Sequence, residues 1–339
     1  MALIPGEKLV ERLWETIAEK GIGALLKPGQ IKREGLAQLQ IERAKSLIEA
    51  QTSRDVDSIK NGQRNASDFS LDVGFRAIGD AYKAARIEPV ITDSELEAAI
   101  ERQSIKESMR REINATKAIL IADEQLRADE AVPPTEKVEE DWLHRWKNCA
   151  SEVSADELQG LWGKILAGEV KKPGTYTLRC LEFIRNISQT EAKLIEKMCA
   201  FAISNGYIWR PDSGLRKYGL EFDELLDLQE LGIVTGIEGM MHFTVAIPQG
   251  AKDRWQSVIV NHEKCLIAYI PTEKTSYQIP VYPITNLGRQ LLGLSKFSST
   301  ALYINDFGSW LKSQGMDVII GDVIKNDNTG ISWINGTPI

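Results

Sequence analysis

The sequence predicts a mainly α protein with a C-terminal α+β part, and three observations lead to this expectation. The first 130 residues are rich in Ala, Glu, Lys, Arg and Gln and poor in aromatic residues, a composition typical of long exposed helices. Several Ser/Thr-x-x-Glu capping boxes stand ahead of apolar stripes with helical spacing. After about residue 217, the apolar residues fall into short, strand-like runs separated by turn residues.

Composition and local charge indicate how the chain is divided. Of its 339 residues, 43% are apolar and 26% are charged, which are ordinary values for a globular protein of two or three domains. Pro133 and Pro134 lie in an acidic stretch with little to bury, which indicates a linker. We expect four regions: a helical N-terminal arm (1–130), an acidic linker (131–141), a helical central domain (142–216) and a winged-helix-like α+β domain (217–339).

The arm is expected to contain two long helices with narrow apolar stripes. The first covers about 31–60, and its seam consists of Ala37, Ile41, Ala44 and Ile48. The second opens at a capping box formed by Thr92 and Glu95 and extends to about Leu126. Its stripe consists of Leu96, Ile100, Ile105, Met109, Ile113 and Leu120.

Such narrow stripes must pack against something. The two helices either form an antiparallel hairpin or pair with another chain, and the arm could also fold back onto the central domain. Two isolated helices with small seam residues bury too little area to offset the entropy lost on ordering. We therefore expect a homo-oligomer. The interaction candidates are Ala37, Ile41, Ala44, Ile48, Ile105, Met109 and Ile113.

The central domain is predicted to be a bundle of short helices anchored by tryptophans. Trp142 and Trp146 are four residues apart and share one helix face. Trp162 and Leu166 repeat this spacing in the next predicted helix. We interpret all four residues as a structural motif that should be buried together.

Two further capping boxes divide the bundle. Ser154 with Glu157 is expected to begin the helix that contains Trp162. Ser188 with Glu191 is expected to begin a helix that continues to about Ser204.

The C-terminal region combines helices with strands, in an order that resembles a winged helix. We expect the following elements: a helix over 222–231, a hairpin between 233–234 and 241–247, a helix start near 285, a helix over 301–313, and strands over 317–324 and 331–334.

No motif of catalysis, cofactor binding or metal binding is recognisable. Glycine-rich phosphate loops, G-x-S-x-G and H-E-x-x-H are missing, and the four cysteines and three histidines are too scattered for a zinc site. We therefore expect no catalytic residues, no cofactor and no metal. A metal-dependent nuclease remains an alternative, because Asp317, Asp322 and Lys325 lie on or beside one predicted strand.

The distribution of charge bears on two other kinds of partner, duplex DNA and a membrane surface. Five carboxylates on the predicted helix 222–231 would repel phosphates, so we do not expect binding to duplex DNA. Residues 1–35 contain an amphipathic segment followed by basic residues, which makes peripheral membrane contact an alternative. No run of residues resembles a signal peptide or a membrane span, so the expected location is the cytoplasm, with peripheral membrane contact as the alternative.

The segment from Asp141 to Ile195 has a distinctive pattern. Its motifs include Asp141-Trp142-Leu143, Leu161-Trp162, Ile165-Leu166-Ala167-Gly168 and Pro173-Gly174. They resemble a bacterial family known as domain of unknown function 2806. They are also distantly similar to abortive-infection alpha proteins, which implies a role in defence against phage and supplies no catalytic residue. We expect a non-enzymatic sensor or adaptor that acts through an unknown protein partner and through self-association.

Overall fold

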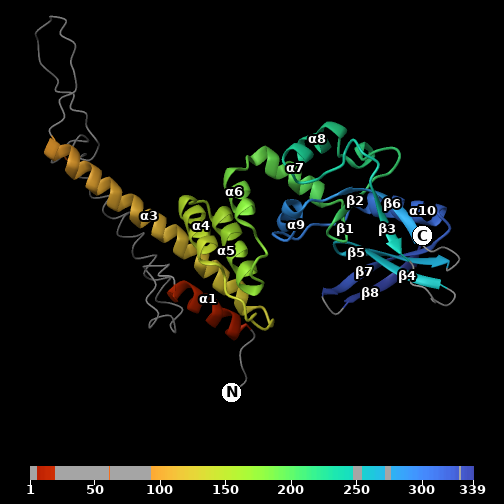
Figure 1. The fold of residues 1–339 in the computed structure, drawn as a ribbon, viewed down its shortest axis with the longest axis horizontal. Helices are drawn as coiled ribbons and strands as arrows, with labels where there is room; N and C mark the ends of the chain where they lie inside the picture. The colour runs from red at the N-terminus through yellow and green to blue at the C-terminus, as the bar shows by residue number, and fades with distance from the viewer. Residues whose placement is uncertain (1–5, 20–60, 62–92, 247–253, 272–275, 328–329) are drawn as a thin grey trace, which may run out of the picture. The chain divides into compact units, whose positions relative to one another are not determined.

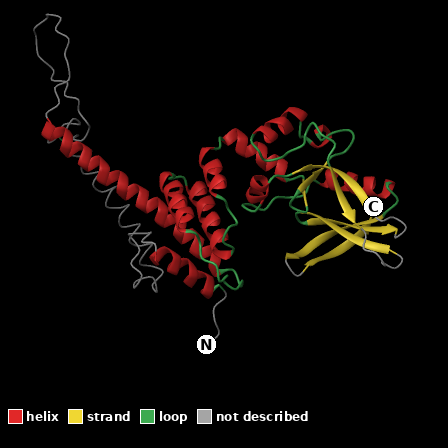
Figure 2. Ribbon diagram, in the orientation of Figure 1, coloured by secondary structure: helices red, strands yellow, loops and turns green. Residues whose placement is uncertain are grey.

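The chain divides into two compact units, residues 1–175 and 176–339. The structure is a computed structural model that describes residues 6–19, 61, 93–246, 254–271, 276–327 and 330–339. Among these residues, all strands lie in the second unit and the first unit is helical (Figure 2). This arrangement confirms the predicted mainly α fold with a C-terminal α+β part.

The first unit is built around one long helix. Its helices are α1 (Glu7–Glu19), α3 (Asp93–Arg127), α4 (Glu140–Glu152) and α5 (Asp156–Lys171). The observed bounds of α3 agree with the capping box and the stripe that predicted it. The C-terminal part of α3 lies beside α4 and α5 (Figure 1).

A glycine sets the distance between α3 and α5. A Cβ atom added at Gly163 would lie 2.6 Å from Cγ2 of Ile121 and 3.0 Å from the carbonyl oxygen of Ala118. Small residues on the facing side of α3, such as Ala118 and Ala122, are fully buried there. The two backbones therefore approach more closely than larger side chains would allow.

The four residues of the predicted tryptophan motif are all buried. Trp142, Trp146, Trp162 and Leu166 are each at most 3% exposed. The indole Nε1 of Trp146 donates a hydrogen bond of 2.9 Å to the carbonyl oxygen of Trp162. The bond satisfies a polar atom in the interior and links α4 to α5.

Helix α1 covers another side of the bundle. Its side chains Leu9, Leu13 and Ile17 are buried, and the helix packs on α3 and α5. Arg12 reaches the predicted linker and donates hydrogen bonds to the carbonyl oxygens of Pro134, Thr135 and Glu136, at 3.0–3.3 Å.

The structure therefore divides the chain differently from the regions 1–130, 131–141, 142–216 and 217–339 expected from the sequence. Part of the arm and the acidic linker pack with α4 and α5 in one unit, whereas residues 176–216 belong to the second unit. Composition identified exposed helices correctly in the first half of α3. It could not show that the apolar side chains of α1 are buried in the same unit.

The Ser154–Glu157 capping box is not formed, although α5 begins where it was predicted. The N-cap residue of α5 is Ala155, without a side-chain hydrogen bond. The Ser154 hydroxyl instead accepts hydrogen bonds from Arg110 and Asn114 of α3. Because these residues of a distant helix engage it, the hydroxyl does not cap α5.

The second unit begins with two capped helices, α6 (Leu178–Asn186) and α7 (Gln189–Cys199). Ser188 and Glu191 form both hydrogen bonds of the predicted capping box. Helix α7 is shorter than expected, because the chain turns into a hairpin of β1 (Ala202–Ile203) and β2 (Tyr207–Trp209). Ser204 and Asn205 adopt positive φ angles of 46° and 53°, which suits a tight turn and ends the helix early.

The first sheet has the strand order β1-β2-β6-β3, with β3 at His242–Ala246 and β6 at Ser276–Pro283. The predicted pairing of 233–234 with 241–247 is wrong. Val234 forms a bridge with Ile284, and β3 pairs with β6. Residues 233–234 and β3 therefore both pair with the segment 276–284 and not with each other. Helix α8 (Phe222–Glu230) and helix α9 (Asn286–Leu292), capped by Thr285, lie where they were expected.

The second sheet has the order β4-β5-β7-β8. Its strands are β4 (Arg254–Asn261), β5 (Lys264–Pro271), β7 (Asp317–Asp327) and β8 (Gly330–Pro338), all antiparallel. Helix α10 (Ala301–Ser313) packs against β5 and β7. A Cβ atom at Gly308 would lie 2.1 Å from Cδ1 of Ile339, so the end of the chain is packed on α10.

An aromatic cluster connects α10 with the first sheet. The rings of Trp209 and Phe307 are stacked at 4.8 Å, and Tyr303 contacts Phe201 and Trp209. The fully buried hydroxyl of Tyr303 donates a hydrogen bond to the carbonyl oxygen of Trp209. Its pKa is raised well above the usual value because burial disfavours the charged form.

Candidate interaction surface

Helix α3 has two halves with opposite surroundings. We call residues 93–112 the outer half and residues 113–127 the inner half. In the inner half, Ala115, Ala118, Ile119, Ala122 and Leu126 are 0% exposed. Most side chains from 100 to 112 are exposed, as the helix extends past α4 and α5 (Figure 1). The outer half therefore carries side chains that no other described element of the unit covers.

Three large apolar side chains are exposed on the outer half. Ile100 and Ile105 are each 54% exposed, and Met109 is 45% exposed. At 100° per residue, Ile105 and Met109 lie about 40° apart, whereas Ile100 lies about 140° from Ile105. The predicted single stripe is thus two patches on different sides of the helix. Ile113, half-buried, continues the patch of Ile105 and Met109 toward the bundle.

A buried polar network marks the boundary between the two halves. Asn114, 4% exposed, donates to the carbonyl oxygen of Ser151 at 3.0 Å and to the Ser154 hydroxyl at 3.2 Å. Gln159, 1% exposed, donates to the Asn114 side-chain oxygen at 3.1 Å. These bonds join α3 to the turn between α4 and α5, so the direction in which the outer half leaves the bundle is fixed by tertiary contacts.

Ion pairs stiffen the outer half from within. The Glu107 carboxylate accepts hydrogen bonds from Arg110 at 2.6 Å and from Arg111 at 3.0 Å. These two guanidinium groups lower the pKa of Glu107 to about 2. Pairs three and four residues apart support an exposed helix without any partner.

The inner half is also held by α1. The indole Nε1 of Trp14 donates a hydrogen bond of 2.7 Å to Asp123, and Arg127 donates one of 2.6 Å to the same carboxylate. Asp123 is only 6% exposed, so its charge is compensated by both donors. Nothing in the sequence pattern singled out Asp123, Asn114 or Gln159, because each gains its role from residues distant in sequence.

The structure separates the predicted interaction candidates. Ile105, Met109 and Ile113 lie on α3, as described above. The seam of the first predicted helix, Ala37, Ile41, Ala44 and Ile48, lies outside the described residues.

The carboxylates of the nuclease alternative have structural partners. Asp322 accepts a hydrogen bond of 2.5 Å from Lys264 on β5 and one of 2.7 Å from Asn335 on β8. These donors lower the pKa of the Asp322 carboxyl group. Within the described ranges, no three His, Cys, Asp or Glu side chains are grouped closely enough to hold a metal ion.

The four cysteines, Cys149, Cys180, Cys199 and Cys265, are buried. Burial raises the pKa of the Cys180 and Cys199 thiols to about 12, so neither forms a thiolate at neutral pH. In the parts of the chain that the structure describes, we find no helix with the length and hydrophobicity that a membrane span requires.

Comparison with known proteins supports one of the two predicted resemblances. Residues 97–209, about a third of the chain, match the model of a family described as Protein of unknown function (DUF2806). This region of the chain is therefore similar to that family, and the match covers most of α3 together with α4 to α7. No curated protein and no solved structure matches the chain. Similarity to abortive-infection alpha proteins stays a prediction.

Proposed function

We propose that the protein is a non-enzymatic adaptor that self-associates through the outer half of α3. One observation carries this proposal: the neighbouring side chains Ile105 and Met109 are exposed on a helix whose continuation packs against α4 and α5. Exposed apolar patches on a projecting helix are typical of protein interfaces. The second unit would then be presented to other proteins in more than one copy.

The charge pattern of the outer half favours a second copy as the occupant. Residues 93–101 contain four acidic residues and no basic residue, whereas residues 102–111 contain four basic residues and one acidic residue. In an antiparallel pair, the acidic segment of each copy lies beside the basic segment of the other. A two-fold axis near residue 102 makes this surface self-complementary. A parallel pair would place like charges side by side.

The energetics predict a weak and concentration-dependent association. Burying the exposed part of Ile105 and Met109 contributes about 1 kcal/mol for each side chain, hence about 4 kcal/mol for the four side chains of a pair. Ile100 lies on another side of the helix and adds nothing to this contact. Association itself costs at least about 4 kcal/mol, so these contacts alone give at most a weak complex. The seam predicted for residues 31–60 is a second candidate contact for the same association.

Sedimentation velocity of the full chain over about 1–100 µM tests the proposal. We expect the sedimentation coefficient to rise with concentration, and the double variant Ile105→Ser with Met109→Ser to remain monomeric. Leu158→Ser is a matched control, because Leu158 is an apolar side chain of the same unit with the same 45% exposure as Met109. A wild-type chain that stays monomeric throughout would contradict the proposal.

The two alternative functions gain no support from the structure's contacts. The apolar side chains of α1 are buried in the first unit instead of facing outward. Asp322 is engaged by Lys264 and Asn335. We therefore carry neither the membrane effector nor the nuclease forward as a proposal. The phage-defence setting rests on the distant resemblance alone.

A further inference from the structure

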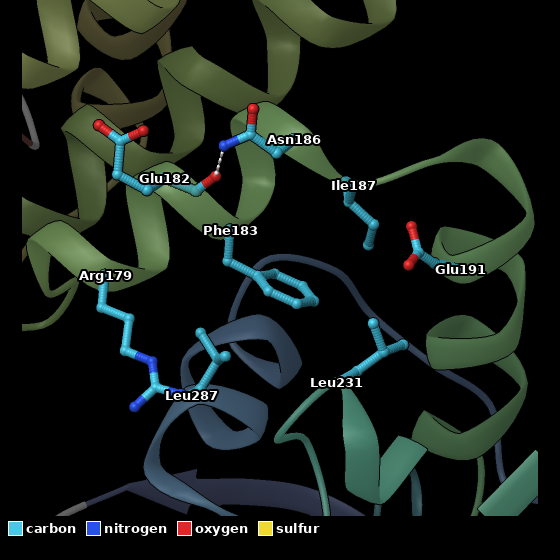
Figure 3. A pocket seen from close by; sticks show the side chains of 8 residues that line it. All are labelled: Arg179, Glu182, Phe183, Asn186, Ile187, Glu191, Leu231 and Leu287. Carbon is cyan, nitrogen blue, oxygen red and sulfur yellow. Dashed lines mark hydrogen bonds between the residues drawn. The ribbon is translucent and has the colours of Figure 1, made fainter. Parts of the chain in front are cut away.

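The second unit contains an open pocket between α6, the start of α7, the end of α8 and α9 (Figure 3). Its volume is about 380 Å³, within the range of ligand pockets. Its eight lining residues come from four separate parts of the unit: Arg179, Glu182, Phe183, Asn186, Ile187, Glu191, Leu231 and Leu287. Of these eight residues, only Leu287 is buried, so the pocket is a surface depression that a chain segment can enter.

The interior of the pocket is apolar and firmly built. Phe183, Ile187, Leu231 and Leu287 supply its apolar surface. The Thr285 hydroxyl donates a hydrogen bond of 2.6 Å to the carbonyl oxygen of Gly232, next to Leu231. A Cβ atom at Gly288 would lie only 2.5 Å from the carbonyl oxygen of Ile233, so α9 is in tight contact with the segment that follows α8. The wall formed by Leu231 and Leu287 therefore exists before any ligand binds.

Opposite charges lie at the two ends of this apolar surface. Figure 3 shows Arg179 at one end and Glu191 at the other, with the Phe183 ring between them. Among the described residues, the Arg179 guanidinium has no hydrogen-bond or ion-pair partner, and its Nη2 lies beside Gly232. Glu191 accepts a hydrogen bond of 2.7 Å from the Ser188 backbone, which holds its carboxylate in place. Glu182 points away from Phe183 and pairs with Arg185.

We propose that this pocket binds a short peptide segment of a partner protein, with one apolar side chain between an acidic residue and a basic residue. The apolar side chain packs on Phe183 and Leu231, the acidic residue pairs with Arg179, and the basic residue lies near Glu191. A small molecule would need more enclosure, because ligand pockets usually bury 70–90% of a drug-sized ligand. The unpaired guanidinium supplies directional recognition of a carboxylate.

A peptide series measures this specificity directly. Fluorescein-labelled nonapeptides with a central Phe are titrated with the full-length protein in fluorescence polarisation. The Phe is flanked by Asp and Lys in either order, by Lys on both sides, or by Ser on both sides. We expect the peptides with one Asp and one Lys to bind the wild-type protein at least tenfold more tightly than the Ser-flanked peptide. Arg179→Glu should reverse the preference, so that peptides with two Lys flanks bind the variant best.

Matched variants separate recognition from folding. Lys193→Gln removes an exposed cation of α7 that does not line the pocket, and it should leave every affinity unchanged. Phe183→Ser should weaken all peptides alike, with thermal unfolding showing whether the unit remains folded. Equal binding of charged and Ser-flanked peptides, an unchanged preference in Arg179→Glu, or binding of hexanoate but of no peptide would each overturn the proposal. None of these outcomes depends on self-association through α3.

Discussion

The two halves of α3 belong to one continuous helix but have different neighbours. In the inner half, Ala115, Ala118 and Ala122 are small, and Gly163 of α5 lets the helices approach closely. In the outer half, Ile100, Ile105 and Met109 remain exposed, although the equally large Ile119 is buried in the inner half. Apolar residues at helical spacing thus predict that a helix will be covered, but the helices that face it decide where it is covered.

The largest difference is expected when the same substitution is made in each half. Ile119→Ala should destabilise the first unit by about 2–5 kcal/mol, because Ile119 is 0% exposed and its loss leaves a cavity. Ile105→Ala should change monomer stability by less than about 0.5 kcal/mol, since Ile105 is 54% exposed. Urea unfolding at low protein concentration measures both. Comparable losses at the two positions would show that the outer half is already packed in the monomer.

The close approach of α3 and α5 can be tested with two glycines of α5. Gly163→Ala should destabilise the unit by about 1–3 kcal/mol, because the added methyl group collides with Ile121 and Ala118. Gly160→Ala should be neutral or stabilise it by up to about 1 kcal/mol, since nothing lies within 4 Å and alanine favours the helix. If both variants behave alike in thermal unfolding, the helices are not as close as described.

The contact between α1 and the inner half is expected to contribute less to the stability of the first unit than the packing of α3 on α5. Trp14→Phe removes the hydrogen bond to Asp123 but keeps most of the aromatic volume. We expect a loss of about 1 kcal/mol, because Arg127 continues to compensate the carboxylate. In a protein that already carries Asp123→Asn, Trp14→Phe should lower the free energy of unfolding by less. A double-mutant cycle measures this difference. Equal costs in both backgrounds would exclude coupling between the two side chains.

The smallest effect concerns pH and lies in the outer half. The pKa of Glu107 is lowered to about 2, first by the hydrogen bond from Arg110 and then by that from Arg111. The folded state therefore favours the charged carboxylate. Its contribution should be fully present above the ordinary pKa of about 4.5 and be lost as the pH falls through 2. NMR titration of the Glu107 carboxyl group, with Arg110→Gln as a comparison that should raise the pKa, checks this sign.

Local signals predicted the helices well. The capping box of Thr92 and Glu95 predicted the start of α3, and the box of Ser188 and Glu191 is formed as expected. At the start of α7, the residues that decide the structure are neighbours in sequence. Ser154 shows where such reasoning ends, because its hydroxyl accepts hydrogen bonds from Arg110 and Asn114 of a distant helix instead of capping its own.

Strand pairing and the candidate surfaces depended on contacts that no local pattern contains. The partner of β3 is β6, about thirty residues further along the chain, so the glycines after Val234 suggested a hairpin that does not form. The position of Arg179 beside an apolar pocket follows from the packing of α6 near Gly232, which the sequence does not reveal.

Pulsed electron paramagnetic resonance on two spin-labelled variants tests most directly whether the outer half pairs with a second copy. Gln103→Cys places a label near the proposed two-fold axis, and Glu124→Cys places one on the inner half; both positions are exposed, and the four native cysteines are buried. Antiparallel pairing gives a distance of about 20 Å or less between labels at 103 and about 65 Å between labels at 124. Absence of dipolar coupling at 103, or short distances at both positions, would contradict it.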